Sequence, residues 1–128
     1  MQTFLPYPSF SESSQVLRTP DLGTQRTENF LILRAIFEDR DWSSRHPVVD
    51  QWRGYEWLLM QYQLAICAEW VSRGREDKTL RKTQRLYQMH CPPISPGLPE
   101  WLGDESYHQE QQERLLNRNR KHYSRYFV

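Results

Sequence analysis

Glu28 is the residue of this 128-residue chain whose surroundings best suit acid–base chemistry. If the segment around it is helical, its neighbours three and four positions on are Leu31 and Ile32, so its side chain lies beside an apolar surface. A carboxyl group that is partly shielded from water can exchange protons with a bound substrate and stabilise developing positive charge. The alternative interpretation is a partly exposed glutamate that pairs with a nearby basic side chain.

Basic side chains are concentrated in two later segments, although the formal charge of the whole chain is only +1. Six basic residues and two acids lie between Arg73 and Arg85, and five basic residues with no acid lie between Arg114 and Arg125. The overall charge therefore gives no information about a polyanionic partner, whereas the local clusters could bind one. Aromatic residues of the C-terminal tail, residues 120–128, could stack on bases or seal the core.

Three main helices are predicted to position these groups, over residues 19–38, 49–73 and 105–118. The first begins at Thr19-Pro20-Asp21, where a capping residue, a proline suited to the first turn and an acid follow one another. The second ends in a basic turn followed by Gly74, a common helix stop. The third follows Asp104 and has an unusually polar inner face.

The remaining segments are predicted to be connections around one compact domain, residues 1–128. Residues 1–18 are expected to form an extended arm that docks through its aromatic side chains. A loop is expected over residues 41–49, and the proline-rich segment 91–99 must also be a loop. Residues 76–89 have a weaker helical pattern. Because no segment shows the alternation of a strand, the predicted fold class is all-α with long loops.

Several classes of protein are disfavoured by composition. Cys67 and Cys91 are too few for a disulfide scaffold and are expected to be free thiols. His90 and Cys91 are adjacent rather than spaced to share a metal ion, and no glycine-rich phosphate loop occurs, so no metal or cofactor is expected. No apolar run is long enough to span a membrane and no signal peptide is evident, which favours a cytoplasmic protein.

Taken in order, these segments resemble the pyrimidine-dimer DNA glycosylase family, the phage endonuclease V-like glycosylases and AP lyases with their bacterial relatives. Leu22 and Glu28 keep the separation between a leucine and the catalytic glutamate of the family's first helix. Ala65–Gly74 is similar to the end of its second helix, and Pro99–Asp104 to the segment before its third. His108 and the aromatic, basic tail complete the resemblance.

The resemblance implies an enzyme that excises a damaged or modified pyrimidine from duplex DNA by attack of the N-terminal amine on the sugar. In this chain the amine belongs to Met1, and Glu28 is the matching carboxylate. The resulting Schiff base permits AP-lyase cleavage of the strand. An α-amine suits this role because it is less basic than a lysine side chain, and more of it is neutral at neutral pH.

The chain departs from the family at two positions near these residues. Gln2 follows Met1, and an initiator methionine is generally not removed before a large side chain, so Met1 itself is expected to present the amine. The phage enzymes have an arginine immediately before the glutamate, where this chain has Thr27. Arg26, one residue earlier, replaces it only approximately.

A lesion-binding enzyme needs phosphate anchors and flat groups that stack or wedge into the duplex. The candidate DNA-contacting residues are Arg18, Arg26, Arg45, His46, His108, Lys121, Tyr123, Arg125 and Tyr126. The alternatives are a solvated surface for the basic residues, a cap of the next helix for His46, and a sealed core for Tyr123, Tyr126 and Phe127. The expected partner is duplex DNA, bound by a monomer.

Two other functions remain open from the sequence. The first is a non-catalytic helical module of the same fold that binds DNA or a protein through its basic faces. The second is an N-glycosidase that acts on another nucleic-acid substrate. The fold alone does not separate these alternatives from a DNA-repair glycosylase.

Overall fold

The computed structural model describes residues 1–38 and 46–127. Within those residues the protein is built of helices and contains no strand, which confirms the predicted all-α class. The helices are α1 (Phe10–Val16), α2 (Thr19–Glu38), α3 (Pro47–Trp52), α4 (Glu56–Ser72), α5 (Thr79–His90), α6 (Glu105–Arg118) and α7 (Arg120–Tyr123). None of them is both long and apolar enough to cross a bilayer.

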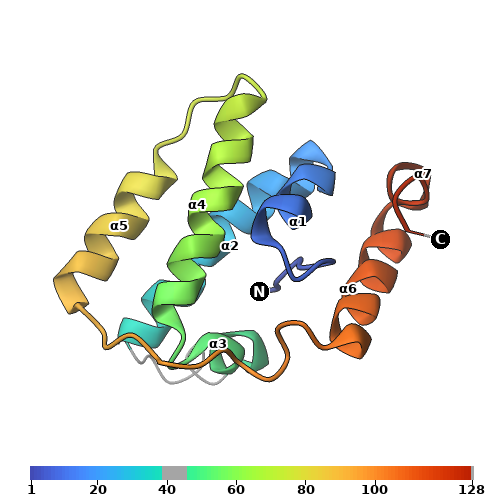
Figure 1. The fold of residues 1–128 in the computed structure, drawn as a ribbon. Coiled ribbons are helices and arrows are strands. Elements are labelled where there is room, and N and C mark those ends of the chain that lie inside the picture. The colour runs from blue at the N-terminus through green and yellow to red at the C-terminus, as the bar shows by residue number, and fades with distance from the viewer. Residues whose placement is uncertain (39–45, 128) are drawn as a thin grey trace.

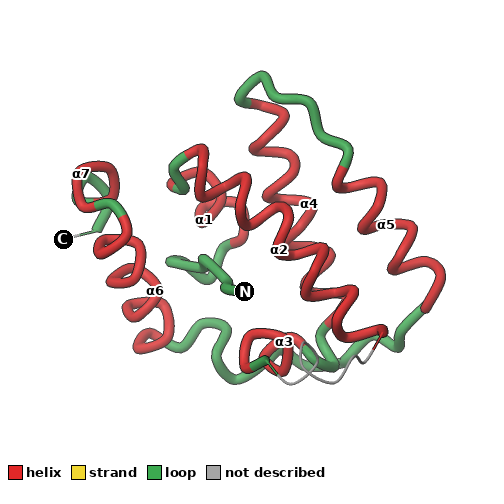
Figure 2. Tube along the Cα trace, turned by 180° about the vertical axis from the view of Figure 1, so that it is seen from behind, coloured by secondary structure: helices red, strands yellow, loops and turns green. Residues whose placement is uncertain are grey.

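Helices α2 and α4 pack together in the middle of the molecule (Figure 1). Helix α5 lies at one end and α6 with α7 at the other, as the view from behind also shows (Figure 2). The buried core draws side chains from the N-terminus, the central helices and the C-terminal part of the chain. Examples are Leu5, Leu22, Trp52, Leu59 and Leu115, all fully buried.

The first and third predicted helices are observed with the predicted bounds, but the second is not one helix. Residues 49–73 are divided between α3 and α4 by a turn at residues 53–55. Gly54, in this turn, has a φ of +88°, a left-handed conformation that favours glycine. The apolar pattern continues across the break because Trp52, before it, and Leu59, after it, are both buried in the same core.

Three further helices lie in the segments that the sequence predicts as an extended arm, a weaker helix and a C-terminal tail. Helix α1 falls within residues 1–18 because Ser9 caps it, its Oγ accepting a hydrogen bond of 3.1 Å from the Glu12 N–H. The N-terminal arm is therefore residues 1–9. Helix α5 corresponds to the weak pattern over residues 76–89, and α7 is a single short turn in the tail. Most of the predicted loop 41–49, including Arg45, lies outside the described residues.

Gly23 is the residue of α2 over which the Trp70 ring of α4 lies. A Cβ atom at position 23 would be 3.0 Å from Trp70 Cζ3. The ring is held in place, because its Nε1–H donates to the Glu76 carbonyl at 3.1 Å and the Arg26 and Arg75 guanidinium groups lie over it. The close approach of the two helices therefore favours glycine, because a Cβ would force the Trp70 ring to shift.

The Gly23→Ala variant should be less stable than the wild type by about 1 kcal/mol in its free energy of unfolding. The crowding of Trp70 outweighs the gain of about 1 kcal/mol that alanine brings to a helix interior. Urea denaturation measures the difference. Gly97→Ala is the matched control, since a Cβ there meets nothing within 4 Å. An unfolding free energy of Gly23→Ala at or above that of the wild type would contradict the expectation.

Candidate active site

The N-terminal arm is bound along its length by buried side chains, beginning with Gln25 of α2. The Gln25 Oε1 accepts a hydrogen bond of 2.6 Å from the Phe4 N–H, and its Nε2 donates to the Gln2 carbonyl at 3.2 Å. The same Nε2 donates to Asn29 Oδ1 at 2.7 Å, which fixes the amide's orientation. Because Gln25 is fully buried, its polar atoms serve the arm rather than solvent.

Aromatic side chains of α3 and α4 hold the next part of the arm. The Trp52 Nε1–H donates to Thr3 Oγ1 at 3.0 Å, and the Tyr62 hydroxyl donates to the Phe4 carbonyl. Both rings are fully buried and stack on each other at a centroid distance of 6.1 Å. They therefore anchor the arm in the core while satisfying their own polar atoms.

Helix α6 completes the binding of the arm from the opposite side. The Leu5 carbonyl lies 2.9 Å from His108 Nδ1, and the Gly103 N–H donates to His108 Nε2 at 2.9 Å. Because Nε2 accepts a hydrogen bond, the proton of the neutral ring is on Nδ1 and is donated to the arm. Gln112 Nε2 donates to the Pro6 carbonyl at 3.0 Å. The arm thus lies between α6 and the central helices (Figure 1).

Glu28 lies beside the start of the arm, as the functional interpretation of the sequence requires. Its Oε2 accepts a hydrogen bond of 2.8 Å from the backbone N–H of Gln2, which is 26 residues away in the sequence. Glu28 and Met1 are both half-buried, and the Met1 side chain packs against the core. Glu28 binds the backbone nitrogen of Gln2, whereas the α-amine belongs to Met1, the residue that precedes it. A carboxylate in this position can exchange protons with groups at the chain start.

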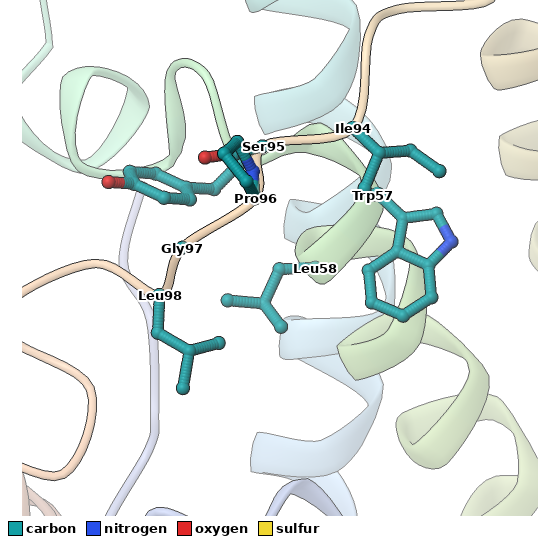
Figure 3. Close-up of a pocket in the computed structure, with 8 residues that line it drawn as sticks. Trp57, Leu58, Ile94, Ser95, Pro96, Gly97 and Leu98 are labelled. Carbon is teal, nitrogen blue, oxygen red and sulfur yellow. The ribbon is translucent and has the colours of Figure 1, made fainter.

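Two cavities lie near the arm and the central helices. A cleft of about 360 Å³, lined by both polar and apolar side chains, separates residues 6–8 of the arm from α6. His108 borders it, so a side chain that positions the arm also faces this opening. A second pocket, of about 210 Å³, lies between the start of α4 and residues 94–98. Trp57, Leu58, Ile94 and Leu98 give it an apolar lining (Figure 3). Within the described residues, none of those predicted to bind DNA lines this second pocket.

Asp21, at the start of α2, is a fully buried carboxylate that joins α2 to the C-terminal part of the chain. Arg118 Nε lies 2.5 Å from Asp21 Oδ1, and the Tyr123 hydroxyl donates to Oδ2 at 2.6 Å. The Nε of Arg18 lies 3.4 Å from Oδ2. Burial alone would raise the pKa of Asp21, but the hydrogen bonds from Tyr123, Arg118 and Arg18 together lower it.

The C-terminal tail is divided between buried and exposed side chains. Tyr123 is fully buried, and burial, followed by its bond to Asp21, raises the pKa of its hydroxyl. Phe127 is also buried. Both rings therefore seal the core, which was the alternative to stacking on DNA bases. Lys121, Arg125 and Tyr126 are exposed and available to a partner.

Arg26 is held within the protein at the junction of α2 and α5. Its Nη1 lies 2.5 Å from Asp77 Oδ1 and donates to Thr79 Oγ1 at 2.7 Å, and its guanidinium lies over the Trp70 ring. Burial would raise the pKa of Asp77, but the bonds from Arg26 and from the backbone N–H groups of Thr79 and Leu80 lower it. A phosphate contact by Arg26 would have to compete with Asp77.

The other predicted DNA contacts have partners within the protein or lie outside the described residues. The His46 Nδ1 accepts a hydrogen bond of 3.2 Å from the Val48 N–H and so caps α3. Arg18 is half-buried beside Asp21. Arg45 is outside the described residues. His108 has both ring nitrogens engaged within the protein, so its role in this conformation is to position the arm.

Gln25 and Asp21 were not selected from the sequence, although one signal pointed to them. Both lie on the stripe of α2 that carries Leu22 and Asn29, where a polar side chain must find a buried partner. The partners themselves come from the arm and from α6 and α7. Within residues 1–38 and 46–127, no group of three or more His, Cys, Asp and Glu side chains is arranged to hold a metal ion.

Comparison with known proteins identifies a matching family. No curated protein and no solved structure matches the chain. A family model described as pyrimidine dimer DNA glycosylase matches residues 1–83, which include the arm, Glu28 and helices α1 to α4. Helices α6 and α7, with His108 and the tail, lie beyond the matched residues. Because the match covers well over half of the chain, the protein belongs to the pyrimidine dimer DNA glycosylase family.

Proposed function

We propose that the protein excises a damaged or modified pyrimidine from duplex DNA, with the amine of Met1 as nucleophile and Glu28 as the assisting carboxylate. The observation that carries the proposal is the hydrogen bond of 2.8 Å between Glu28 Oε2 and the Gln2 N–H, which sets the carboxylate one residue from the amine. Membership of the family supports the same class of reaction and substrate.

In the proposed reaction the neutral amine attacks C1′ of the damaged nucleotide, a C1′–N bond to the protein forms, and the bond to the base breaks with its electron pair leaving on the base. The attached nitrogen gives up one of its two protons, to the departing base or to Glu28. Its lone pair then breaks the bond from C1′ to the ring oxygen, which takes up a proton, and the Schiff base forms as an iminium that keeps the second N–H. Abstraction of a proton from C2′ then expels the 3′ phosphate by β-elimination. Glu28 is suited to stabilise positive charge at the sugar and to accept protons from the amine.

We propose that the exposed tail residues Lys121, Arg125 and Tyr126 contact the duplex, the first two at phosphates and the third by stacking. Their exposure supports this assignment. His46 and Arg18 are offered as further phosphate contacts at the edge of the helical body. One copy of the chain suffices for the proposed reaction, because Met1 and Glu28 belong to the same chain.

Borohydride trapping tests the proposal directly. The protein is incubated with a duplex containing an abasic site, or with one containing a cyclobutane dimer, and the Schiff base is reduced to a stable adduct. We expect an adduct with the abasic duplex that disappears when the α-amine is acetylated, and base release from a damaged duplex. If neither an adduct nor base release is found while the duplex is still bound, the protein is a non-catalytic DNA-binding module.

The Gln2→Ala variant tests which backbone position the amine must occupy. A small second residue allows Met1 to be removed, and the new amine then lies where the Gln2 nitrogen now binds Glu28 at 2.8 Å. We expect the trapped fraction to equal or exceed that of the wild type, with intact mass confirming the loss of Met1. Loss of the adduct in a variant that has lost Met1 would show that Met1 itself is required.

A further inference from the structure

A row of basic side chains follows the outer face of α5 and the residue that precedes it. Lys78, Arg81, Lys82 and Arg85 are spaced three and four positions apart, so they lie on one face of the helix. All four are exposed, and they line a groove of about 500 Å³ together with Glu76 and Asp77. We call these four residues the α5 basic row. It contributes no contact to the arm or to Glu28.

The positive charge of the α5 basic row is not neutralised by the acids in the groove. Asp77 is already paired with Arg26 at 2.5 Å, and its oxygens also accept hydrogen bonds from the Thr79 and Leu80 N–H groups. Glu76 is the other acid of the groove. Within the part of the chain that the structure describes, no ion pair involves any member of the row. Four cations therefore face solvent beside one unpaired carboxylate.

The opposite face of α5 is used for packing and is not available to a lipid surface. Thr83 is buried, its hydroxyl 3.2 Å from Gln63 Nε2 of α4, and Leu86 and Tyr87 pack against the core. At the end of α5 the His90 ring stacks on Phe37 of α2 at 4.2 Å. Apart from Met89 near its C-terminal end, which is 79% exposed, the apolar side chains of α5 are at least partly covered, so α5 offers a partner mainly charge.

The length of the row suits a phosphodiester backbone. At 1.5 Å per residue, the seven steps from Lys78 to Arg85 extend about 10 Å, which matches roughly three nucleotides of one strand at 3.4 Å each along the duplex axis. We propose that the α5 basic row binds the phosphate backbone of duplex DNA away from the nucleotide that reacts. This inference rests on the proposed function for its choice of duplex DNA as the partner.

The position of α5 makes this contact separate from the tail. In both views α5 lies at the end of the molecule opposite α6 and α7 (Figures 1 and 2). It is joined to α2, which carries Glu28, through the bonds of Arg26 to Asp77 and Thr79. A backbone contact at α5 would therefore strengthen DNA binding without touching the groups that react.

The triple variant Arg81→Gln, Lys82→Gln, Arg85→Gln tests the proposal by fluorescence anisotropy with an undamaged duplex. We expect its affinity to fall roughly 10- to 100-fold at moderate salt, and the slope of log K against log salt concentration to decrease by about 2 to 3. The single-turnover rate of base release at saturating protein should stay at the wild-type value. Circular dichroism confirms that the exposed substitutions leave the helices intact.

A second variant, Arg34→Gln, Arg53→Gln, removes two charges from exposed positions outside the row and outside the basic segment 114–125. We expect it to keep the wild-type affinity and salt slope. An unchanged salt slope in the α5 variant, or equal losses in both variants, would overturn the inference even if base release is found. If the wild type releases no base, the proposed function is overturned instead. The DNA affinities and salt slopes of the two variants can still be compared in that case.

Discussion

Replacing Glu28 with glutamine should lower the single-turnover rate of base release by roughly 10²- to 10⁴-fold, with little change in affinity for DNA. The amide oxygen of glutamine can still accept the Gln2 N–H, so the chain start stays in place. What is lost is the negative charge and the capacity to exchange protons with the amine and sugar. The rate is measured with the protein in excess over a duplex containing the lesion.

Glu113→Gln is the matched control for this prediction, because Glu113 is an exposed glutamate of α6. It removes the same charge and should react at the wild-type rate. The ratio of trapped adduct to base released in Glu28→Gln separates attack from later steps. If Glu28→Gln releases base and traps at wild-type rates, the contact with Gln2 is structural only and another group assists the amine.

Replacing Asp21 with asparagine should reduce the free energy of unfolding by roughly 3 kcal/mol, because removing one member of a buried charged cluster leaves its partners unbalanced. Arg118 and the Tyr123 hydroxyl lose a charged acceptor at 2.5 and 2.6 Å. The arginine side chains are partly exposed and can rehydrate, which keeps the loss at the lower end of the usual range. Urea denaturation at neutral pH measures the change.

The same carboxylate should make stability depend on pH in acid. Hydrogen bonds lower the pKa of Asp21 and of Asp77 in the folded protein, so each contributes stability above its unfolded pKa of about 3.9. That contribution is lost as the pH falls below about 4 and through the folded values. Below about pH 4, the free energy of unfolding of Asp21→Asn should therefore change less with pH than that of the wild type.

Asp50→Asn serves as the control for both measurements, since Asp50 pairs with Arg53 at the surface at 3.3 Å. An exposed pair of this kind contributes about 0 to 1 kcal/mol, so this variant should unfold like the wild type. If Asp21→Asn were as stable as Asp50→Asn, the buried cluster would not hold the tail to α2 as described.

Local patterns were enough to predict the bounds of α2 and α6, because helical periodicity and residues that favour a first turn act within a few residues. The predicted caps differ, since α2 already includes Thr19 and Asp104 makes no side-chain capping bond. They were not enough to predict the break between α3 and α4, since the core-facing pattern continues through the turn at Gly54. The burial of Tyr123 was undecided for a different reason. Its partner Asp21 is 102 residues away, and no local pattern records a contact of that range.

The candidate active site likewise combines a residue that the sequence predicts with residues whose role depends on distant contacts. Glu28 was identified from its place on a helix and from a family resemblance, and the structure brings it next to the chain start. The residues that place the arm were not selected for that role, because each acts through a backbone group of the arm rather than through a recognisable motif. Gln25 illustrates this: its amide binds the backbone of both Gln2 and Phe4.

The way the arm is bound has a consequence for how the protein folds. The arm is synthesised first, but His108 and Gln112 lie 103 and 106 residues after the arm residues that they bind. Closing contacts of such high sequence separation is slow relative to forming helices, so docking of the arm is expected to be a late step. During synthesis the contacts of Gln2 and Phe4 with α2 can form early, whereas those of Leu5 and Pro6 must wait until α6 has emerged and packed. The arm that carries the proposed nucleophile is thereby fully enclosed only after the last long helix has folded.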